Sequence, residues 1–145
     1  MTALKAACEA IGLELMEGQT KYQCWGTGKS LSQLESYQRM SNKKLMPEGF
    51  TLGEMGQCEH AIRAKRKTGH YEIGLTKRKD GRAGWLLHCD ISGALAIKEC
   101  AGADLGKLKQ GYSVEVAIRA AKRAGFRVVK REIRTDGSVA IVTQR

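Results

Sequence analysis

Long apolar runs, aromatic side chains and paired cysteine motifs are scarce or absent in this sequence of 145 residues. No apolar stretch approaches the ~20 residues that a membrane-spanning helix needs, which excludes that class of protein. Hydrophobic residues make up 42% of the chain and the mean hydropathy is −0.37, values typical of a soluble globular protein. Aromatic residues make up only 6%, so few side chains are available to stack against nucleic-acid bases.

Signals that direct a chain out of the cytoplasm are also missing. The first ten residues place Lys5 and Glu9 among alanines, and they have neither the apolar core nor the cleavage site of a secretory signal. The five cysteines are odd in number, include no C-x-x-C pair and show no spacing of a disulfide framework. Free thiols suit a reducing compartment, so we expect a cytoplasmic protein.

Positive charge, by contrast, is in excess. The chain carries 25 Lys and Arg against 15 Asp and Glu, a formal net charge of +10, and its pI is near 9.6. Such a charge creates a positive surface potential that concentrates phosphate-bearing partners at the protein. Nucleic acid, nucleotides and acidic protein faces are the candidate partners, and the alternative is that the charge serves only solubility.

The first half of the chain combines two short elements with a long polar segment. Helical spacing and the following Gly12 predict a helix from the N-cap Thr2 through Ala10, and a strand is expected over 13–17. The segment 18–57 is rich in Gly, Ser and Gln, contains the only proline and has a weak helical pattern near its middle. We predict a long excursion that is either partly helical or an element for binding and assembly.

From residue 58 onward the apolar residues alternate. This period of two predicts three successive strands, with residues of one face at 58–62, 71–75 and 85–89. Lys67-Thr68-Gly69 and Asp80-Gly81 stand between them as turns, which indicates an antiparallel meander.

A long helix and a hairpin complete the pattern. Asp104 is suited to cap a helix that runs to about Ala124 and ends at Gly125. The apolar stripe of this helix, which we expect to lie on the sheet, consists of Leu105, Leu108, Tyr112, Val116 and Ala120. A hairpin over 126–135 and 138–144 follows, turned by Asp136-Gly137.

The order of elements predicts the fold class. It is α-β-(long loop)-β-β-β-α-β-β within a single domain, residues 1–145. Helices that punctuate runs of hairpin-linked strands indicate an α+β fold, with two helices packed on one face of a mostly antiparallel sheet.

Several short motifs occur in an order that resembles a known family. They are Met46-Pro47-Glu48-Gly49-Phe50-Thr51, Gly56-Gln57-Cys58-Glu59-His60-Ala61-Ile62, Tyr71-Glu72-Ile73-Gly74, Leu108-Lys109-Gln110-Gly111-Tyr112-Ser113-Val114-Glu115-Val116 and Asp136-Gly137-Ser138-Val139. Across about the last two thirds of the chain, they resemble a family of small uncharacterised proteins first described as a hypothetical reading frame in algal plastid genomes. The family also occurs in bacteria and their phages.

The resemblance implies a setting and partners. The expected compartment is the cytoplasm of a bacterial cell, or that of the host cell for a phage-encoded protein. Bacterial members tend to be encoded beside a ring-forming AAA+ ATPase, which implies an accessory role in an assembly. Members begin with a strand before the first helix, and this chain starts with the helix. We therefore expect an exposed sheet edge that favours pairing as a homodimer.

Catalytic and metal-binding motifs are incomplete. Gly26-Thr27-Gly28-Lys29-Ser30 resembles the end of a phosphate-binding loop, but Gln23 stands where the first glycine belongs. Cys58 and His60 are two apart on a predicted strand and outline a zinc site, although cysteine on a strand face is ordinarily core. His70, Glu72 and Asp90 are candidates for acid and base roles, but polar residues are common on the solvated face of a sheet.

Basic clusters are the stronger signal. Phosphate contacts by Lys and Arg supply affinity that does not depend on sequence and that falls with salt. The candidate anion-binding residues are Arg63, Lys65, Arg66, Lys77, Arg78, Lys107, Lys109, Arg119, Lys122 and Arg123. Trp25, Tyr22 and Lys29 are the candidates for stacking or loop contacts, and Tyr37 is a further aromatic residue of the long segment that we expect to be exposed for stacking.

The sequence therefore predicts a non-enzymatic binding protein without a cofactor. Its expected ligand bears phosphate, either a nucleotide or nucleic acid, and in a phage or bacterial setting the protein would sequester a nucleotide signal. One alternative is an adaptor for a ring-forming AAA+ ATPase, in which the same charge meets an acidic protein. The other alternative is a metal-dependent enzyme.

Overall fold

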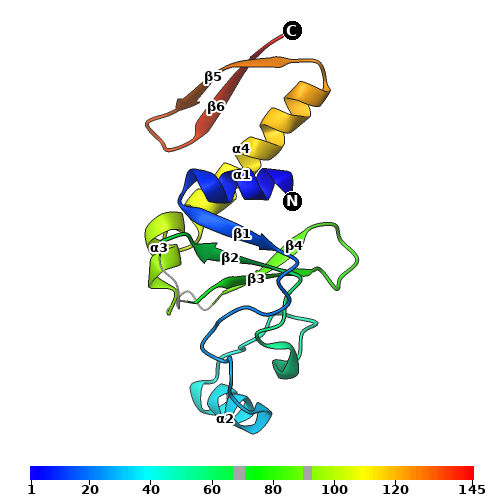
Figure 1. The fold of residues 1–145 in the computed structure, drawn as a ribbon, viewed down its shortest axis with the longest axis vertical. Coiled ribbons are helices and arrows are strands. Elements are labelled where there is room, and N and C mark those ends of the chain that lie inside the picture. Colours follow the sequence, from blue (N-terminus) through cyan, green and yellow to red (C-terminus); the bar gives the residue numbers. More distant parts are fainter. Residues whose placement is uncertain (67–70, 90–92) are drawn as a thin grey trace.

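The computed structural model describes residues 1–66, 71–89 and 93–145. Its elements, in chain order, are α1 (Thr2–Ala10), β1 (Leu13–Glu17), α2 (Leu31–Ser41), the 3-10 turn η1 (Leu52–Glu54), β2 (His60–Ala64), β3 (Ile73–Lys77), β4 (Trp85–His88), α3 (Leu95–Ala101), α4 (Gly106–Arg123), β5 (Arg127–Ile133) and β6 (Val139–Gln144). Within these described ranges, four helices occur together with a four-stranded and a two-stranded sheet, both antiparallel, which confirms the α+β class (Figure 1). The order differs from the prediction by the additional helices α2 and α3 and the turn η1.

The central sheet has four antiparallel strands in the order β1-β2-β3-β4. Leu15 lies opposite Ile62, and Ile62 lies opposite Ile73, so β-branched and leucine side chains form a row across the sheet. The predicted meander is confirmed. Its first turn, Lys67-Thr68-Gly69, lies outside the described residues, as do His70 and Asp90. β1 forms one edge of this sheet, and pairing of that edge in a homodimer stays a prediction.

One face of the sheet carries the main core. Alternate strand residues such as Leu13, Ile62 and Leu75 are fully buried there. They pack with Leu4 of α1 and Ile97 of α3 in a single apolar cluster. Burial of this apolar surface is the main force that holds α1 and α3 on the sheet.

The opposite face of the sheet is covered by the excursion over residues 18–57. Tyr22, 4% exposed, packs with Ala61 in a second, smaller core. A Cβ at Gly74 would lie 2.3 Å from the Tyr22 ring, so only glycine at this position lets the ring lie flat on β3. Glu72 accepts hydrogen bonds from the backbone N–H of Gln23 and the side chain of Gln19, which fixes the excursion to the sheet.

The excursion is partly helical. Ser30 caps α2, since its hydroxyl accepts from the Gln33 N–H and the Gln33 side chain accepts from the Ser30 N–H. This reciprocal pair is a strong local signal for a helix start, and it explains why a polar stretch with one buried leucine, Leu34, forms a helix.

The prediction for the apolar stripe of α4 is wrong in its second half. Leu108 is buried, but Tyr112 is 44% exposed and Val116 is 39% exposed. The helix packs on α1 instead of lying on the sheet with these side chains, because Gly111 allows close approach to Ala7. The predicted cap is also displaced, since α4 begins after Leu105, and Asp104 accepts a hydrogen bond from the Gly106 N–H.

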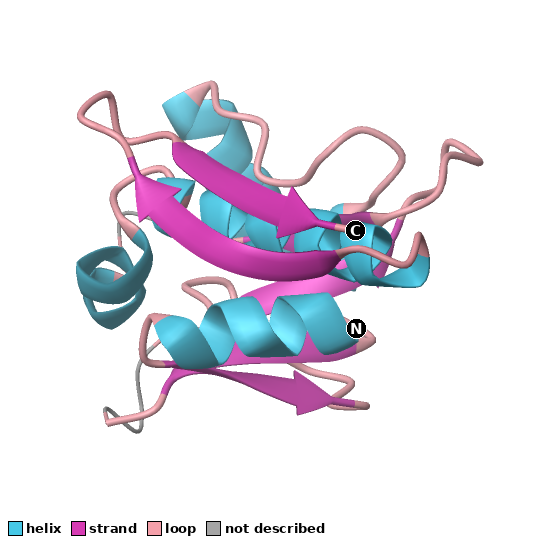
Figure 2. Ribbon diagram, turned by 90° about the horizontal axis from the view of Figure 1, so that it is seen from above, coloured by secondary structure: helices cyan, strands magenta, loops and turns pink. Residues whose placement is uncertain are grey.

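The last two strands form a sheet of their own and do not extend the central one. The hairpin β5–β6 contacts α4 and lies over it when seen from above (Figure 2). In residues 115–145, all of which the structure describes, no side chain is fully buried. We call α4 with this hairpin, residues 106–145, the C-terminal arm. Figure 1 places the hairpin and α2 at opposite ends of the molecule.

Within the described ranges, no helix is long and apolar enough to cross a membrane.

Candidate ligand-binding site

The predicted basic residues of the meander do not form one patch. Lys65 and Arg66 follow the end of β2, whereas Lys77 and Arg78 lie where β3 ends. Because β2 and β3 are antiparallel neighbours, these two groups lie at opposite ends of the sheet. A single phosphate group therefore cannot contact both groups.

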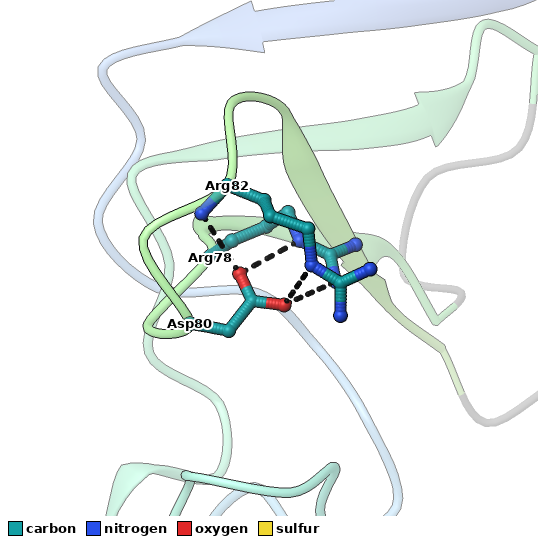
Figure 3. A network of polar contacts seen from close by, with 3 residues as sticks. All are labelled: Arg78, Asp80 and Arg82. Carbon is teal, nitrogen blue, oxygen red and sulfur yellow. Dashed lines mark hydrogen bonds and ion pairs between the residues drawn. The ribbon is translucent and has the colours of Figure 1, made fainter.

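Two of the predicted arginines are bound to carboxylates of the protein itself. Arg78 Nε lies 3.0 Å from Asp80 Oδ1, and Arg82 Nε lies 2.9 Å from Asp80 Oδ2, so one carboxylate bridges two guanidinium groups (Figure 3). These contacts, with that of Arg78 first, lower the pKa of Asp80 to about 2. Arg63 Nη2 lies 3.0 Å from Glu14 Oε2. Arg63 and Arg78 thus organise the sheet and its turn.

The predicted cations of α4 divide into two groups. Lys107, Lys109, Lys122 and Arg123 are exposed and form no ion pair with the described residues. Arg119 instead reaches α1, where its Nη2 lies 3.4 Å from the carbonyl oxygen of Thr2, and it also lies 4.0 Å from a carboxylate oxygen of Glu115.

The excursion encloses a cavity against the central sheet. Its volume is about 610 Å³, within the range of small-molecule sites in proteins. It is lined by Tyr22, Cys24, Trp25, Gly26, Tyr37, Lys43, Lys44, Leu45, Met46, Pro47, Met55, Leu87, His88 and Cys89.

Aromatic rings form one wall of this cavity. The ring centroids of Trp25 and Tyr37 are 4.4 Å apart at an interplanar angle of 45°. Lys29 Nζ lies 4.6 Å from the centroid of the Trp25 ring, a cation–π distance. Lys43 and Lys44 lie at the mouth of the cavity with exposed side chains. Flat apolar rings and positive charge therefore occur side by side.

The turn that holds Trp25 is fixed by local packing. The Cys24 N–H donates to Thr27 Oγ1 at 2.9 Å, and the Thr27 hydroxyl donates to the carbonyl of Tyr22. A Cβ at Gly26 would lie 1.9 Å from Met55 Sδ, so the glycine lets the Met55 side chain pack directly on the turn. These contacts position the indole without any ligand.

The phosphate-loop-like stretch Gly26-Thr27-Gly28-Lys29-Ser30 forms a turn and a helix cap, not an anion cradle. The Thr27 and Lys29 N–H groups donate to carbonyl oxygens of this turn, and the Ser30 N–H donates to Gln33. Three of the amides that a phosphate cradle would use are therefore already bonded.

The floor of the cavity contains His88 and Tyr22, both buried. His88 Nε2 lies 2.6 Å from Thr76 Oγ1, and its ring contacts Phe50 edge-on at 4.9 Å between centroids. Burial lowers the pKa of His88, so the ring is neutral near pH 7. Burial likewise raises the pKa of Tyr22, which keeps its hydroxyl protonated.

The metal candidates Cys58 and His60 are engaged in other contacts. The Cys58 thiol donates to the carbonyl of Gln19 at 3.1 Å, and His60 Nδ1 accepts from the Gly18 N–H at 2.9 Å. Among the residues that the structure describes, no three His, Cys, Asp or Glu side chains are grouped to hold a metal ion.

Some lining residues were not predicted from the sequence. Lys43 and Lys44 are brought to Trp25 by the segment that follows α2, whereas Tyr37 of α2 was among the aromatic residues expected to be exposed for stacking. Comparison with protein-family models, with curated proteins and with solved structures finds no match for this chain. The family resemblance therefore stays a prediction.

Proposed function

We propose that the chain is a non-enzymatic binding protein for a phosphate-bearing ligand of nucleotide size. The observation that carries this proposal is the cavity of about 610 Å³, in which an aromatic pair and two exposed lysines line the same space. A nucleotide presents the matching combination, a flat base joined to a charged phosphate.

The aromatic wall supports recognition of the base. Trp25 and Tyr37 are only partly covered, so each has ring surface left for a ligand. Stacking of a base on an aromatic side chain contributes about 1–3 kcal/mol.

The charge of the lining supports recognition of the phosphate. Its ionisable side chains include Lys43, Lys44 and His88, and no carboxylate is among the described lining residues. Because His88 is neutral, the positive charge lies at the mouth, where a phosphate attached to a buried base would be found. This set of groups favours binding over acid and base chemistry.

Tryptophan fluorescence tests the proposal directly. The chain has two tryptophans, and Trp85 packs on His60 instead of lining this cavity, so a Trp85→Phe variant reports Trp25 alone. We expect ADP to quench Trp25 in a saturable manner, and adenosine and inorganic phosphate each to bind more weakly than ADP. Trp25→Ala, followed by calorimetry, should weaken ADP binding by roughly tenfold or more.

A charge-matched pair of variants separates the cavity from general attraction. Lys43→Gln with Lys44→Gln should weaken ADP binding and leave adenosine binding unchanged. Lys5→Gln with Lys65→Gln removes the same charge from exposed sites away from the cavity and should change neither. No saturable binding, or equal losses in the two double variants, would refute the nucleotide site.

The same preparations address the alternatives. Copurification with a ring-forming AAA+ ATPase, without nucleotide binding by this chain, would favour the adaptor role. Stoichiometric metal in native mass spectrometry, together with a turnover that chelation abolishes, would favour the metal-dependent enzyme.

A further inference from the structure

The C-terminal arm carries most of the net charge of the protein. Ten of the 25 Lys and Arg residues lie in residues 106–145, together with only three of the 15 acidic residues. The arm thus has a net charge of +7, and the remaining 105 residues share +3. It also lies on the other side of the central sheet from the excursion (Figure 1), whose residues line most of the cavity.

The few acidic residues of the arm are already engaged. Glu115 faces Arg119, Glu132 pairs with Lys130, and Asp136 accepts from the Ser138 N–H in the hairpin turn. Exposed cations without an ion pair to any described residue remain along both elements of the arm. They are Lys107, Lys109, Lys122, Arg123, Arg127, Arg131 and Arg134.

The form of the arm suits an extended ligand. α4 has 18 residues and is therefore about 27 Å long, which matches roughly eight base pairs of duplex. The hairpin adds a two-stranded ribbon, and a ribbon or helix of these dimensions fits the major groove. With no fully buried side chain after Val114, most of this surface is open to a partner.

The positive charge of the C-terminal arm indicates which kind of partner it binds. A second copy would bring another +7 against the same surface, which disfavours self-association through the arm. When a lysine or arginine contacts a phosphate of a polyanion, counterions are released, and this release favours binding. We propose that the C-terminal arm is a nucleic-acid-binding surface that contacts the phosphate backbone, separate from the cavity under the excursion.

Salt-dependent binding of a labelled duplex of about 20 base pairs tests this assignment by fluorescence anisotropy. The arm variant combines Lys109→Gln, Lys122→Gln and Arg123→Gln. The wild type should bind with a steep negative slope of log affinity against log salt concentration. Removal of one cation that contacts a phosphate should reduce the magnitude of that slope by about 0.9, so the arm variant should show a reduction of up to about 2.7.

The matched control removes three charges elsewhere. Arg39→Gln, Lys65→Gln and Arg66→Gln neutralise exposed cations on α2 and after β2, the last two of which the sequence suggested as anion contacts. The control should retain the wild-type slope, and the arm variant should retain its ADP affinity. An equal reduction of slope in both variants, or a wild-type protein that does not bind the duplex, would overturn the proposal.

Competition identifies the class of partner. Excess unlabelled duplex should displace the labelled duplex, whereas poly-glutamate at the same charge concentration should be a much weaker competitor. Equal competition by poly-glutamate would overturn the assignment to nucleic acid and favour an acidic protein partner.

Discussion

Replacement of Gly74 by alanine tests how the excursion is anchored to the sheet. The new Cβ would lie 2.3 Å from Tyr22 Cδ1 and 2.5 Å from Cε1. Carbon atoms in contact are normally about 3.5–4 Å apart, so the ring must move by about 1 Å or more. Tyr22 is 4% exposed and lies in the centre of the smaller core, so little free space is available.

The loss of stability caused by Gly74→Ala can be worked out from the cost of overpacking. Complete exposure of a buried ring of about 200 Å² would cost about 5 kcal/mol, which is an upper limit. Partial displacement should cost about 1–3 kcal/mol of unfolding free energy. For a domain of this length, that corresponds to a Tm lower by roughly 3–10 °C.

A double-mutant cycle of Gly74→Ala and Tyr22→Ala, followed by urea unfolding, measures the coupling between these two positions. In a Tyr22→Ala background the clash is absent, and Gly74→Ala should be neutral or stabilising by up to about 1 kcal/mol, because glycine weakens a strand interior. If Gly74→Ala is equally destabilising with and without the Tyr22 ring, the close approach is not the reason for this glycine.

Two further predictions concern buried titratable groups. Because burial lowers the pKa of His88, this imidazole binds a proton more readily in the unfolded chain than in the folded protein. The contribution of neutral His88 to the free energy of unfolding should therefore be fully present above about pH 6.5 and decrease as the pH falls below that value. Urea unfolding should give a lower free energy of unfolding at about pH 5 than at about pH 8, and this difference should be smaller in His88→Gln. An equal difference in the variant would exclude His88 as its cause. Burial raises the pKa of Cys8 to about 12, so iodoacetamide at about pH 8 should alkylate Cys8 only after unfolding, as peptide mass spectrometry reports. Alkylation of Cys8 in the folded protein would contradict its burial.

The strands were predictable because each has a two-sided environment. Leu13 and Leu15 on β1 lie in the main core, whereas Glu14 and Met16, the alternate residues, are only partly buried on the other face. The sequence did not reveal that the second face would also be covered. That coverage depends on Tyr22 and Gly74, which are 52 positions apart and meet only in the folded chain.

The orientation of α4 could not be predicted from spacing alone. The helix has two apolar stripes, one through Leu108 and Val114 and one through Tyr112 and Val116. The regular spacing of four residues from Leu108 favours the second, but the small residue Gly111 favours the first by allowing close contact with Ala7 of α1.

The candidate site was predicted only in part. Trp25 was expected to contact a ligand, and it does line the cavity. The grouping of Lys43 and Lys44 with it depends on the path of the chain after α2, for which the sequence offered no local signal. Conversely, Arg63 and Arg78 looked available in the sequence because their carboxylate partners come from turns and neighbouring strands.

The contact between α1 and α4 sets the order in which the chain can fold. Leu4 shares its core with Leu105 and Leu108, about a hundred residues later. The small core around Tyr22 and Ala61, with Gly74, closes over a much shorter loop, so its contacts require a smaller decrease in chain entropy. On a ribosome, the excursion can therefore pack on the new sheet early, whereas α1, which covers the other face, lacks its partner helix α4 until Leu108 emerges.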